Sequence, residues 1–169
     1  MTIKTDRLLL REIIDSDIHH IYQGLSHPMV IKHYGVSYDS LEATKEQMDW
    51  YKDPRQSWWA IFSNDGQTFM GAVGLNDISK EHKKAEIGLW LLPDFWGKGI
   101  MSEVMPLICQ YGFRQLGLHR IEGFVDANNK NCKRAMAKLD FKHEGTMTDC
   151  EVKHGEYVSV DIFAKIRSI

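Results

Sequence analysis

The sequence predicts a mixed fold of the α/β (α+β) type, in which a mostly antiparallel central sheet of about seven strands is flanked by about four helices. Two β-rich runs are joined by Asn64-Asp65-Gly66, and an Asp-Gly step favours the positive φ angles of a hairpin turn. A long amphipathic segment after residue 100 separates two strand-like runs, which implies one parallel strand pair. This order does not fit a doubly wound dinucleotide-binding fold.

The amino-terminal part is predicted to contain a strand and two helices. Residues 5–13 (TDRLLLREI) form the strand. Asp15-Ser16-Asp17 offers N-cap chemistry for a first helix, which His27-Pro28 breaks. Ser40 is placed to cap a second helix, and Pro54 ends that region.

A three-stranded meander, a long helix and a final hairpin follow. Pro106 lies inside the long helix and removes one of its hydrogen bonds, and Gly117 ends the helix. The predicted strands are residues 57–63, 68–78, 83–92, 120–126, 142–152 and 156–166, and a short helix covers residues 131–139.

Composition indicates one domain spanning residues 1–169, with 43% apolar and 26% charged residues, as in an ordinary globular protein. The net charge of −2 does not indicate a nucleic-acid-binding protein, which is typically basic. No signal core or long apolar run is present, so we expect no membrane partner and a cytoplasmic location. Three cysteines are too few, and odd in number, for a disulfide scaffold.

The segment Asp94–Ser102 (DFWGKGIMS) carries the strongest chemical signal. Its two glycines, Gly97 and Gly99, stand between a strand-like run and a long helix. Glycines let the backbone approach a ligand, and the following helix directs unpaired N–H groups and the positive end of its dipole at this turn. The pattern therefore predicts a phosphate or pyrophosphate site.

Four segments stand in a characteristic order along the chain: TDRLLLRE, AEIGLWLLP, WGKGIMSE and VDANNKNCKRAMAKLDFKHEG. Together they resemble the GNAT superfamily of acyl-CoA-dependent N-acetyltransferases, and most closely its ribosomal-protein (Rim-type) branch. Two departures accompany the match: Asp94 replaces the family's Gln or Arg, and Asp140 replaces a glycine that follows the last helix.

The resemblance implies acetyl-CoA as co-substrate, with its pyrophosphate held by backbone N–H groups of the glycine turn. It also implies that the strand before the turn binds the pantetheine arm, and that no metal takes part. The cofactor-binding residues expected on this basis are Trp90, Leu91, Leu92, Trp96, Gly97, Lys98, Gly99, Ile100, Met101, Ser102 and Asn129. Asn129 is also a favourable helix cap.

Acyl transfer to an amine requires a proton acceptor and a group that stabilises the departing thiolate. Many family members use a tyrosine of the last helix for the second task, where this chain has Met136. The Rim branch instead places a serine at the position of Cys132, whose thiol titrates in the same range as the CoA thiol. Cys132 is equally well explained as a small buried residue.

Two glutamates are candidates for the base. Glu151 matches the Rim-branch glutamate in the penultimate strand, and Glu86 lies where other GNAT members place theirs. Of the two, Glu151 is preferred from the sequence. At least one of the two is an exposed strand residue without a catalytic role.

The resemblance implies direct attack by a primary amine in a ternary complex, with a protein N-terminal α-amine of ribosomal-protein type as the predicted acceptor. The protein would be a monomer or a homodimer. Three alternatives remain open. They are a small-molecule amine acetyltransferase of polyamine or aminoglycoside type, a non-catalytic acyl-CoA-binding protein, and a cysteine hydrolase built on Cys132. A zinc site at Cys132, Cys150 and His154 lacks any supporting ligand spacing.

Overall fold

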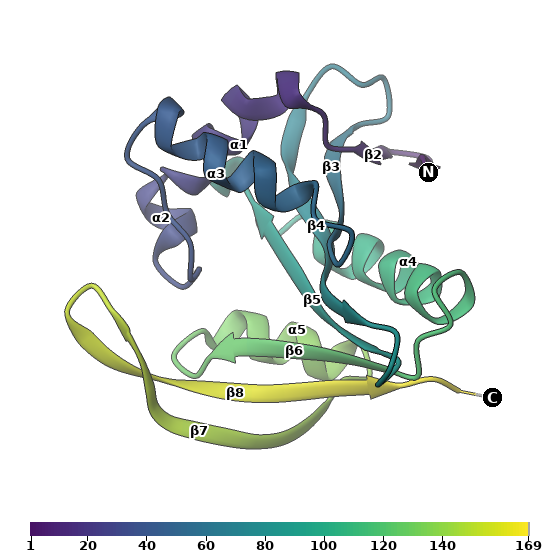
Figure 1. The fold of residues 1–169 in the computed structure, drawn as a ribbon, viewed down its shortest axis with the longest axis vertical. Coiled ribbons are helices and arrows are strands. Elements are labelled where there is room, and N and C mark those ends of the chain that lie inside the picture. The colour runs from purple at the N-terminus through teal and green to yellow at the C-terminus, as the bar shows by residue number, and fades with distance from the viewer. Residues whose placement is uncertain (169) are drawn as a thin grey trace. The chain divides into compact units, whose positions relative to one another are not determined.

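A computed structural model describes residues 1–168, and its strands pair in the order β1-β2-β3-β4-β5-β6-β8-β7 (Figure 1). All pairs with a defined register are antiparallel except β5 with β6. The mixed, mostly antiparallel sheet is therefore confirmed. The strands are β1 (Ile3–Lys4), β2 (Leu8–Glu12), β3 (Ser57–Ser63), β4 (Phe69–Ser79), β5 (Lys84–Leu91), β6 (Arg120–Asp126), β7 (Lys142–Lys153) and β8 (Glu156–Ile166).

Five α-helices and two short 3-10 helices connect the described strands. None of these helices is long and apolar enough to cross a membrane. Their bounds are η1 (Asp15–Asp17), α1 (Ile18–Leu25), α2 (Pro28–Ile31), α3 (Leu41–Tyr51), η2 (Pro93–Phe95), α4 (Ile100–Arg114) and α5 (Lys130–Lys138).

Two short elements were missed by the sequence analysis. Strand β1 has only two residues, too few for an alternating pattern. Pro28 does separate two helices, but it also occupies the first turn of α2, where its missing N–H costs nothing.

Contacts divide the chain into two units, the first comprising residues 1–76 and 88–100 and the second residues 77–87 and 101 onward.

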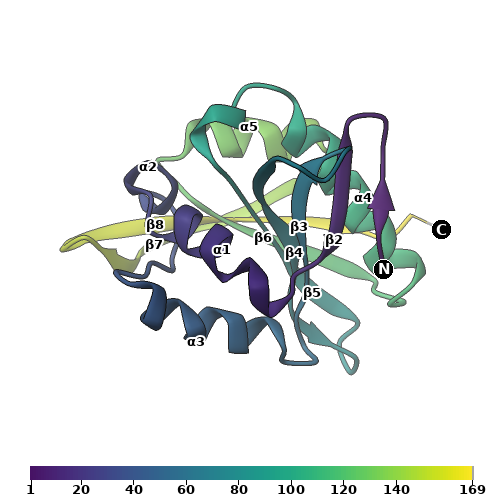
Figure 2. The same cartoon turned by 90° about the horizontal axis from the view of Figure 1, so that it is seen from above.

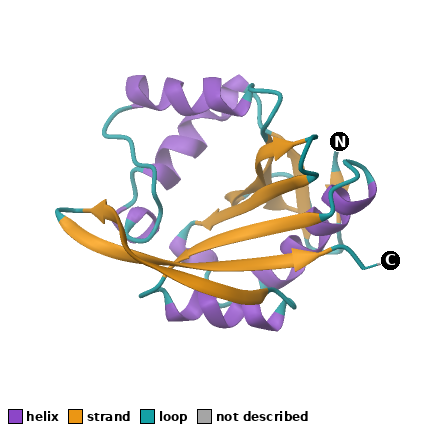
Figure 3. Ribbon diagram, turned by 60° about the horizontal axis from the view of Figure 1, so that its bottom comes forward, coloured by secondary structure: helices purple, strands orange, loops and turns teal. Residues whose placement is uncertain are grey.

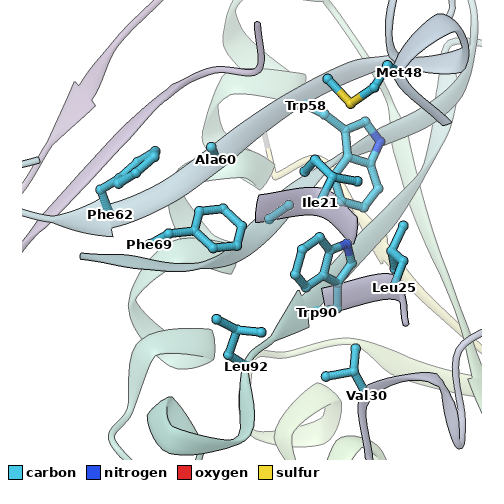
Figure 4. Packing of buried hydrophobic residues seen from close by; sticks show 11 residues of the cluster. Ile21, Leu25, Val30, Met48, Trp58, Ala60, Phe62, Phe69, Trp90 and Leu92 are labelled. Carbon is cyan, nitrogen blue, oxygen red and sulfur yellow. The ribbon is translucent and has the colours of Figure 1, made fainter. Parts of the chain in front are cut away.

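The core of the first unit is built from an apolar cluster contributed by α1, α2, α3 and the strands β3 to β5 (Figure 4). Helices α1 and α3 contact one another and lie side by side in Figure 2. The ring of Trp90 packs so closely on α1 that a Cβ added at Gly24 would lie 2.0 Å from it. Within the first unit, this contact fixes residues 88–91 of β5 against α1.

Local signals in the first unit acted mostly as predicted. Ser40 caps α3 by accepting a hydrogen bond from the N–H of Ala43 at 3.0 Å, and Gly66 has the positive φ of a hairpin turn. Asp17 was expected to cap the first helix, but its buried carboxylate instead accepts two hydrogen bonds from Arg11, each at 2.8 Å. A bidentate guanidinium pair is stronger than a neutral cap hydrogen bond.

The second unit places α5 against the sheet formed by β6, β8 and β7. Figure 3 shows β7 and β8 as two long neighbouring strands. Met136 of α5 packs over Gly123 of β6, where any Cβ would lie 2.3 Å from the methionine Cε. Asp140 has the positive φ of 65° that glycine adopts easily, as its position after the last helix predicts.

Replacement of Gly24 by alanine should destabilise the protein, although alanine is the better helix former. The new methyl group would overlap the buried Trp90 ring, and overpacking of this kind costs about 1–3 kcal/mol. Thermal unfolding of Gly24→Ala should show a lower Tm than the wild type. Gly35→Ala is the matched control, since nothing lies within 4 Å of its added Cβ; an unchanged Tm for Gly24→Ala would refute this packing argument.

Candidate active site

The glycine turn of the first unit has the backbone conformation that an anion cradle requires. Gly97 and Gly99 have φ angles of 71° and 75°, which side chains with a Cβ rarely adopt. The turn is fixed to β5 by a hydrogen bond from the Trp96 indole Nε1 to the Leu91 carbonyl at 2.8 Å. At Gly97 the φ angle is the reason for glycine, because nothing lies within 4 Å of a Cβ built there.

Backbone donors gather at this turn. The N–H groups of Gly97, Lys98 and Gly99 form no hydrogen bond within residues 1–168. The first N–H groups of α4, which begins at Ile100, have no acceptor within the helix. Consecutive unpaired donors at the positive end of a 15-residue helix fit a pyrophosphate.

The side chains of the predicted pantetheine strand take part in the core. Trp90, Leu91 and Leu92 are all buried. Any contact with the pantetheine arm must therefore come from their backbone. The N–H of Leu92 donates to the Met70 carbonyl at 2.8 Å, so this donor is already used within the protein.

Glu86 is a carboxylate of the second unit whose pKa is raised well above its usual value. It is partly buried and forms no hydrogen bond or ion pair with any described residue. Burial is the main cause that raises its pKa to about 7, and the negative charges of Asp77, Glu122 and Glu151 raise it further. A carboxylate with this pKa is half ionised near neutral pH, which suits a general base.

The surroundings explain why the Glu86 carboxylate has no cation partner among the described residues. Its register partner on β6 is Glu122, whose carboxylate binds Lys84 at 2.9 Å and lies 3.5 Å from Arg120. Arg120 also binds Glu144 at 2.6 Å. The two neighbouring cations are thus engaged by other carboxylates, and the charge on Glu86 is left uncompensated.

Glu151 lies on the same sheet face as Glu86. Glu86 pairs with Glu122, Glu122 pairs with Ala164 of β8, and Glu151 pairs with Val158 of the same strand. Val158 and Ala164 are an even number of residues apart on β8, so their side chains project from the same face. Their register partners Glu151 and Glu122 therefore lie on that face as well. Glu151 itself is more exposed, with 51% of its side chain accessible, and lies 3.7 Å from the Lys153 ammonium.

Asn129 and Cys132 lie together at the start of α5. The Asn129 side chain accepts a hydrogen bond from the Cys132 N–H at 3.2 Å, which confirms its role as a cap. Burial raises the pKa of the Cys132 thiol to about 11. The thiol is therefore protonated at neutral pH and can donate a hydrogen bond, but it is a weak acid.

Glu122 and Asp77 were absent from the sequence-predicted site. Their importance depends on the parallel register between β5 and β6, which brings Glu122 beside Glu86. Strand periodicity predicts which face a residue occupies, but not which residue of another strand lies next to it. Among the described histidines, cysteines and acidic residues, no group of three or more is arranged to hold a metal ion.

A family model for the acetyltransferase (GNAT) domain matches residues 7–142, most of the chain. The chain belongs to the GNAT family. It is an acetyl-CoA-dependent N-acetyltransferase, whose substrates are acetyl-CoA and an amine acceptor. The glycine turn and the Glu86 region both fall within the matched residues.

Individual relatives include the uncharacterized N-acetyltransferase YoaA of Bacillus subtilis (strain 168), which is 29% identical over 98% of this chain and 96% of its own. The spermidine N(1)-acetyltransferase of Escherichia coli (strain K12) is 24% identical over 88% of this chain and 80% of its own. The fold matches that of spermidine N-acetyltransferase from Vibrio cholerae in complex with CoA and spermine, with a TM-score of 0.88, 21% identity and 96% of each chain covered.

The expected closeness to the Rim-type branch is not supported. The ribosomal-protein-serine acetyltransferase of Escherichia coli (strain K12) is 26% identical, but the match covers only 63% of this chain and 58% of that protein. The four sequence segments that suggested this branch lie largely within residues 7–142, which the general GNAT family model matches. They identify the cofactor-binding framework rather than the acceptor.

The ionisation of Glu86 should make stability depend on pH. Its folded pKa of about 7 lies above the ordinary value of 4.5, so the native state holds a proton that the unfolded chain releases. The free energy of unfolding should fall as pH rises from about 4.5 through 7. In chemical denaturation, Glu86→Gln should have a higher free energy of unfolding than the wild type, and the difference should grow from pH 5 to pH 8.

Glu151→Gln is the control for this measurement, because Glu151 is more exposed and lies near Lys153. If Glu86→Gln and the wild type lose stability in parallel over this range, ionisation of Glu86 does not cause the pH dependence of the free energy of unfolding.

Proposed function

We propose that this enzyme acetylates a small cationic amine of the polyamine class, with Glu86 as the general base. The observation that carries the proposal is the desolvated, uncompensated carboxylate of Glu86 beside further carboxylates. Such a group attracts a cation and can then remove its proton. The relatives named as spermidine acetyltransferases support the same acceptor class.

The sheet face around Glu86 also has an apolar part. Phe124 and Met147 are 41% and 40% exposed. They lie on the face of Glu122, because their register partners Ile162 and Val160 are an even number of residues from Ala164, the partner of Glu122. Exposed apolar groups beside carboxylates suit an alkyl chain that carries ammonium groups. A protein N-terminus would present one ammonium and a polar peptide backbone instead.

The reaction requires one proton to leave the amine. Glu86 takes this proton, directly or through water, and the amine nitrogen then attacks the thioester carbonyl carbon. A C–N bond forms, the C–S bond breaks, and coenzyme A leaves as a thiolate. The proton held by Glu86 is released to solvent or to the thiolate.

Cys132 is proposed to stabilise the thiolate by a hydrogen bond rather than by complete proton transfer. Its pKa of about 11 exceeds that of an ordinary thiol, about 8.5, so transfer to a less basic thiolate is unfavourable. For acetyl-CoA itself, the glycine turn supplies N–H donors to the pyrophosphate, and Ser102 and the backbone of Trp90 to Leu92 are the further proposed contacts.

A panel of acceptors tests the substrate class. With acetyl-CoA, thiol release should be faster with spermidine and alkyl diamines than with a peptide bearing a free N-terminal α-amine, compared by kcat/KM. A higher kcat/KM for the peptide would contradict the polyamine proposal and would indicate a protein acceptor. Cofactor binding without thiol release from any amine would support a non-catalytic acyl-CoA-binding protein.

The pH dependence of the wild type should reveal the base. We expect kcat/KM to rise with pH through an apparent pKa of about 7, because only the ionised Glu86 accepts a proton. Glu86→Gln should reduce kcat/KM by about 10²- to 10⁴-fold and remove this acidic limb. The matched variant Glu151→Gln should keep the limb; if it loses the limb and Glu86→Gln does not, Glu151 is the base.

Substitution of Cys132 separates hydrogen bonding from packing. Cys132→Ala removes the donor and should lower kcat by about threefold to tenfold, whereas Cys132→Ser should retain most activity. Steady-state kinetics at saturating acetyl-CoA provide the measurement. Unchanged turnover in both variants would leave Cys132 with a packing role alone.

A further inference from the structure

Arg7 connects the start of the chain to the glycine turn. Its guanidinium Nη1 donates a hydrogen bond to the Lys98 carbonyl at 2.8 Å, across 91 positions of sequence. Its Nη2 lies 3.4 Å from the position of a Cβ added at Gly99. Arg7 belongs to the segment TDRLLLRE and directly precedes β2.

The backbone of Arg7 is held rigidly before β2 begins. Its carbonyl accepts a hydrogen bond from the Asn64 N–H at 3.0 Å. Thr5 and Leu8 close the turn around it, because the Thr5 N–H donates to the Leu8 carbonyl and the Leu8 N–H donates to the Thr5 hydroxyl. The exposed guanidinium is therefore presented from a fixed base.

The hydrogen bond to Lys98 determines how the next peptide is oriented. In a trans peptide the C=O and N–H groups point in opposite directions. Because Arg7 binds the Lys98 carbonyl, the N–H of Gly99 in the same peptide must point away from Arg7. This N–H is one of the turn donors that make no hydrogen bond within residues 1–168.

We propose that Arg7 is a positioning residue for the donor substrate, which orients the 98–99 peptide for the pyrophosphate of acetyl-CoA. It also places a permanent positive charge beside that anion. This inference rests on the proposed use of the glycine turn by acetyl-CoA. Since Arg7 acts through the pyrophosphate, it should affect binding of the donor and not the acyl-transfer step.

Two donors of different length test the inference. Arg7→Ala should weaken coenzyme A binding by about tenfold in calorimetry and raise KM for acetyl-CoA to a similar extent, with kcat unchanged. With S-acetylpantetheine, which lacks the pyrophosphate and the nucleotide, kcat/KM should equal that of the wild type. Arg7→Lys keeps the charge without the planar fork and should recover part of the loss.

Lys4→Ala is the matched control, because it removes another exposed cation from the amino-terminal strands of the same unit. Unchanged coenzyme A affinity in Arg7→Ala would overturn the inference, as would an equal loss of kcat/KM with S-acetylpantetheine. Wild-type protein that fails to bind coenzyme A would refute the proposed cofactor site as well. Tight binding by the wild type, the expected effect of Arg7→Ala and no acetylated amine would refute only the proposed acceptor and base.

Discussion

The proposed chemistry of this enzyme depends on one carboxylate whose charge has no cation partner among the described residues. The parallel pairing of β5 with β6 brings Glu86 beside Glu122, and Lys84 and Arg120 both interact with Glu122. Glu86 is consequently partly desolvated, surrounded by negative charge and without a cation. Its carboxylate is costly to ionise in the free protein, and an incoming ammonium group would relieve that cost.

In the proposed arrangement, binding of acetyl-CoA rests on a different physical principle, the alignment of neutral backbone dipoles. Gly97 and Gly99 permit backbone angles that leave several N–H groups unpaired, and α4 adds the positive end of its dipole. The side chain of Lys98, which occupies the x position of the G-x-G pattern, is not needed for this. In the proposed arrangement Arg7 adds a fixed orientation, because it binds a carbonyl of the turn.

Local sequence signals predicted much of the fold. Ser40 and Asn129 cap helices, and Gly66 turns a hairpin, because each effect involves only residues a few positions apart. Asp17 makes no side-chain cap hydrogen bond to α1; its carboxylate binds Arg11 of the preceding strand and accepts the Ile14 N–H at the start of η1. Helix α2 was not predicted, because its four residues are too short for a helical pattern.

The candidate site was less predictable than the fold. The glycine turn is contiguous and could be identified from its residues, whereas the contact between Arg7 and Lys98 joins distant segments. The choice between Glu86 and Glu151 depends on burial and on strand register. Both glutamates occur in strand-like sequence, and only their tertiary surroundings distinguish a partly buried carboxylate from one near a lysine.

A direct titration of Glu86 tests the central claim most closely. In protein labelled with ¹³C at the glutamate carboxyl carbons, Glu86→Gln assigns the resonance by its loss. The wild-type resonance should titrate with an apparent pKa of about 7 in the absence of substrate. A midpoint at or below the ordinary value of 4.5 would show that Glu86 is not desolvated or is compensated, and would contradict the proposed base.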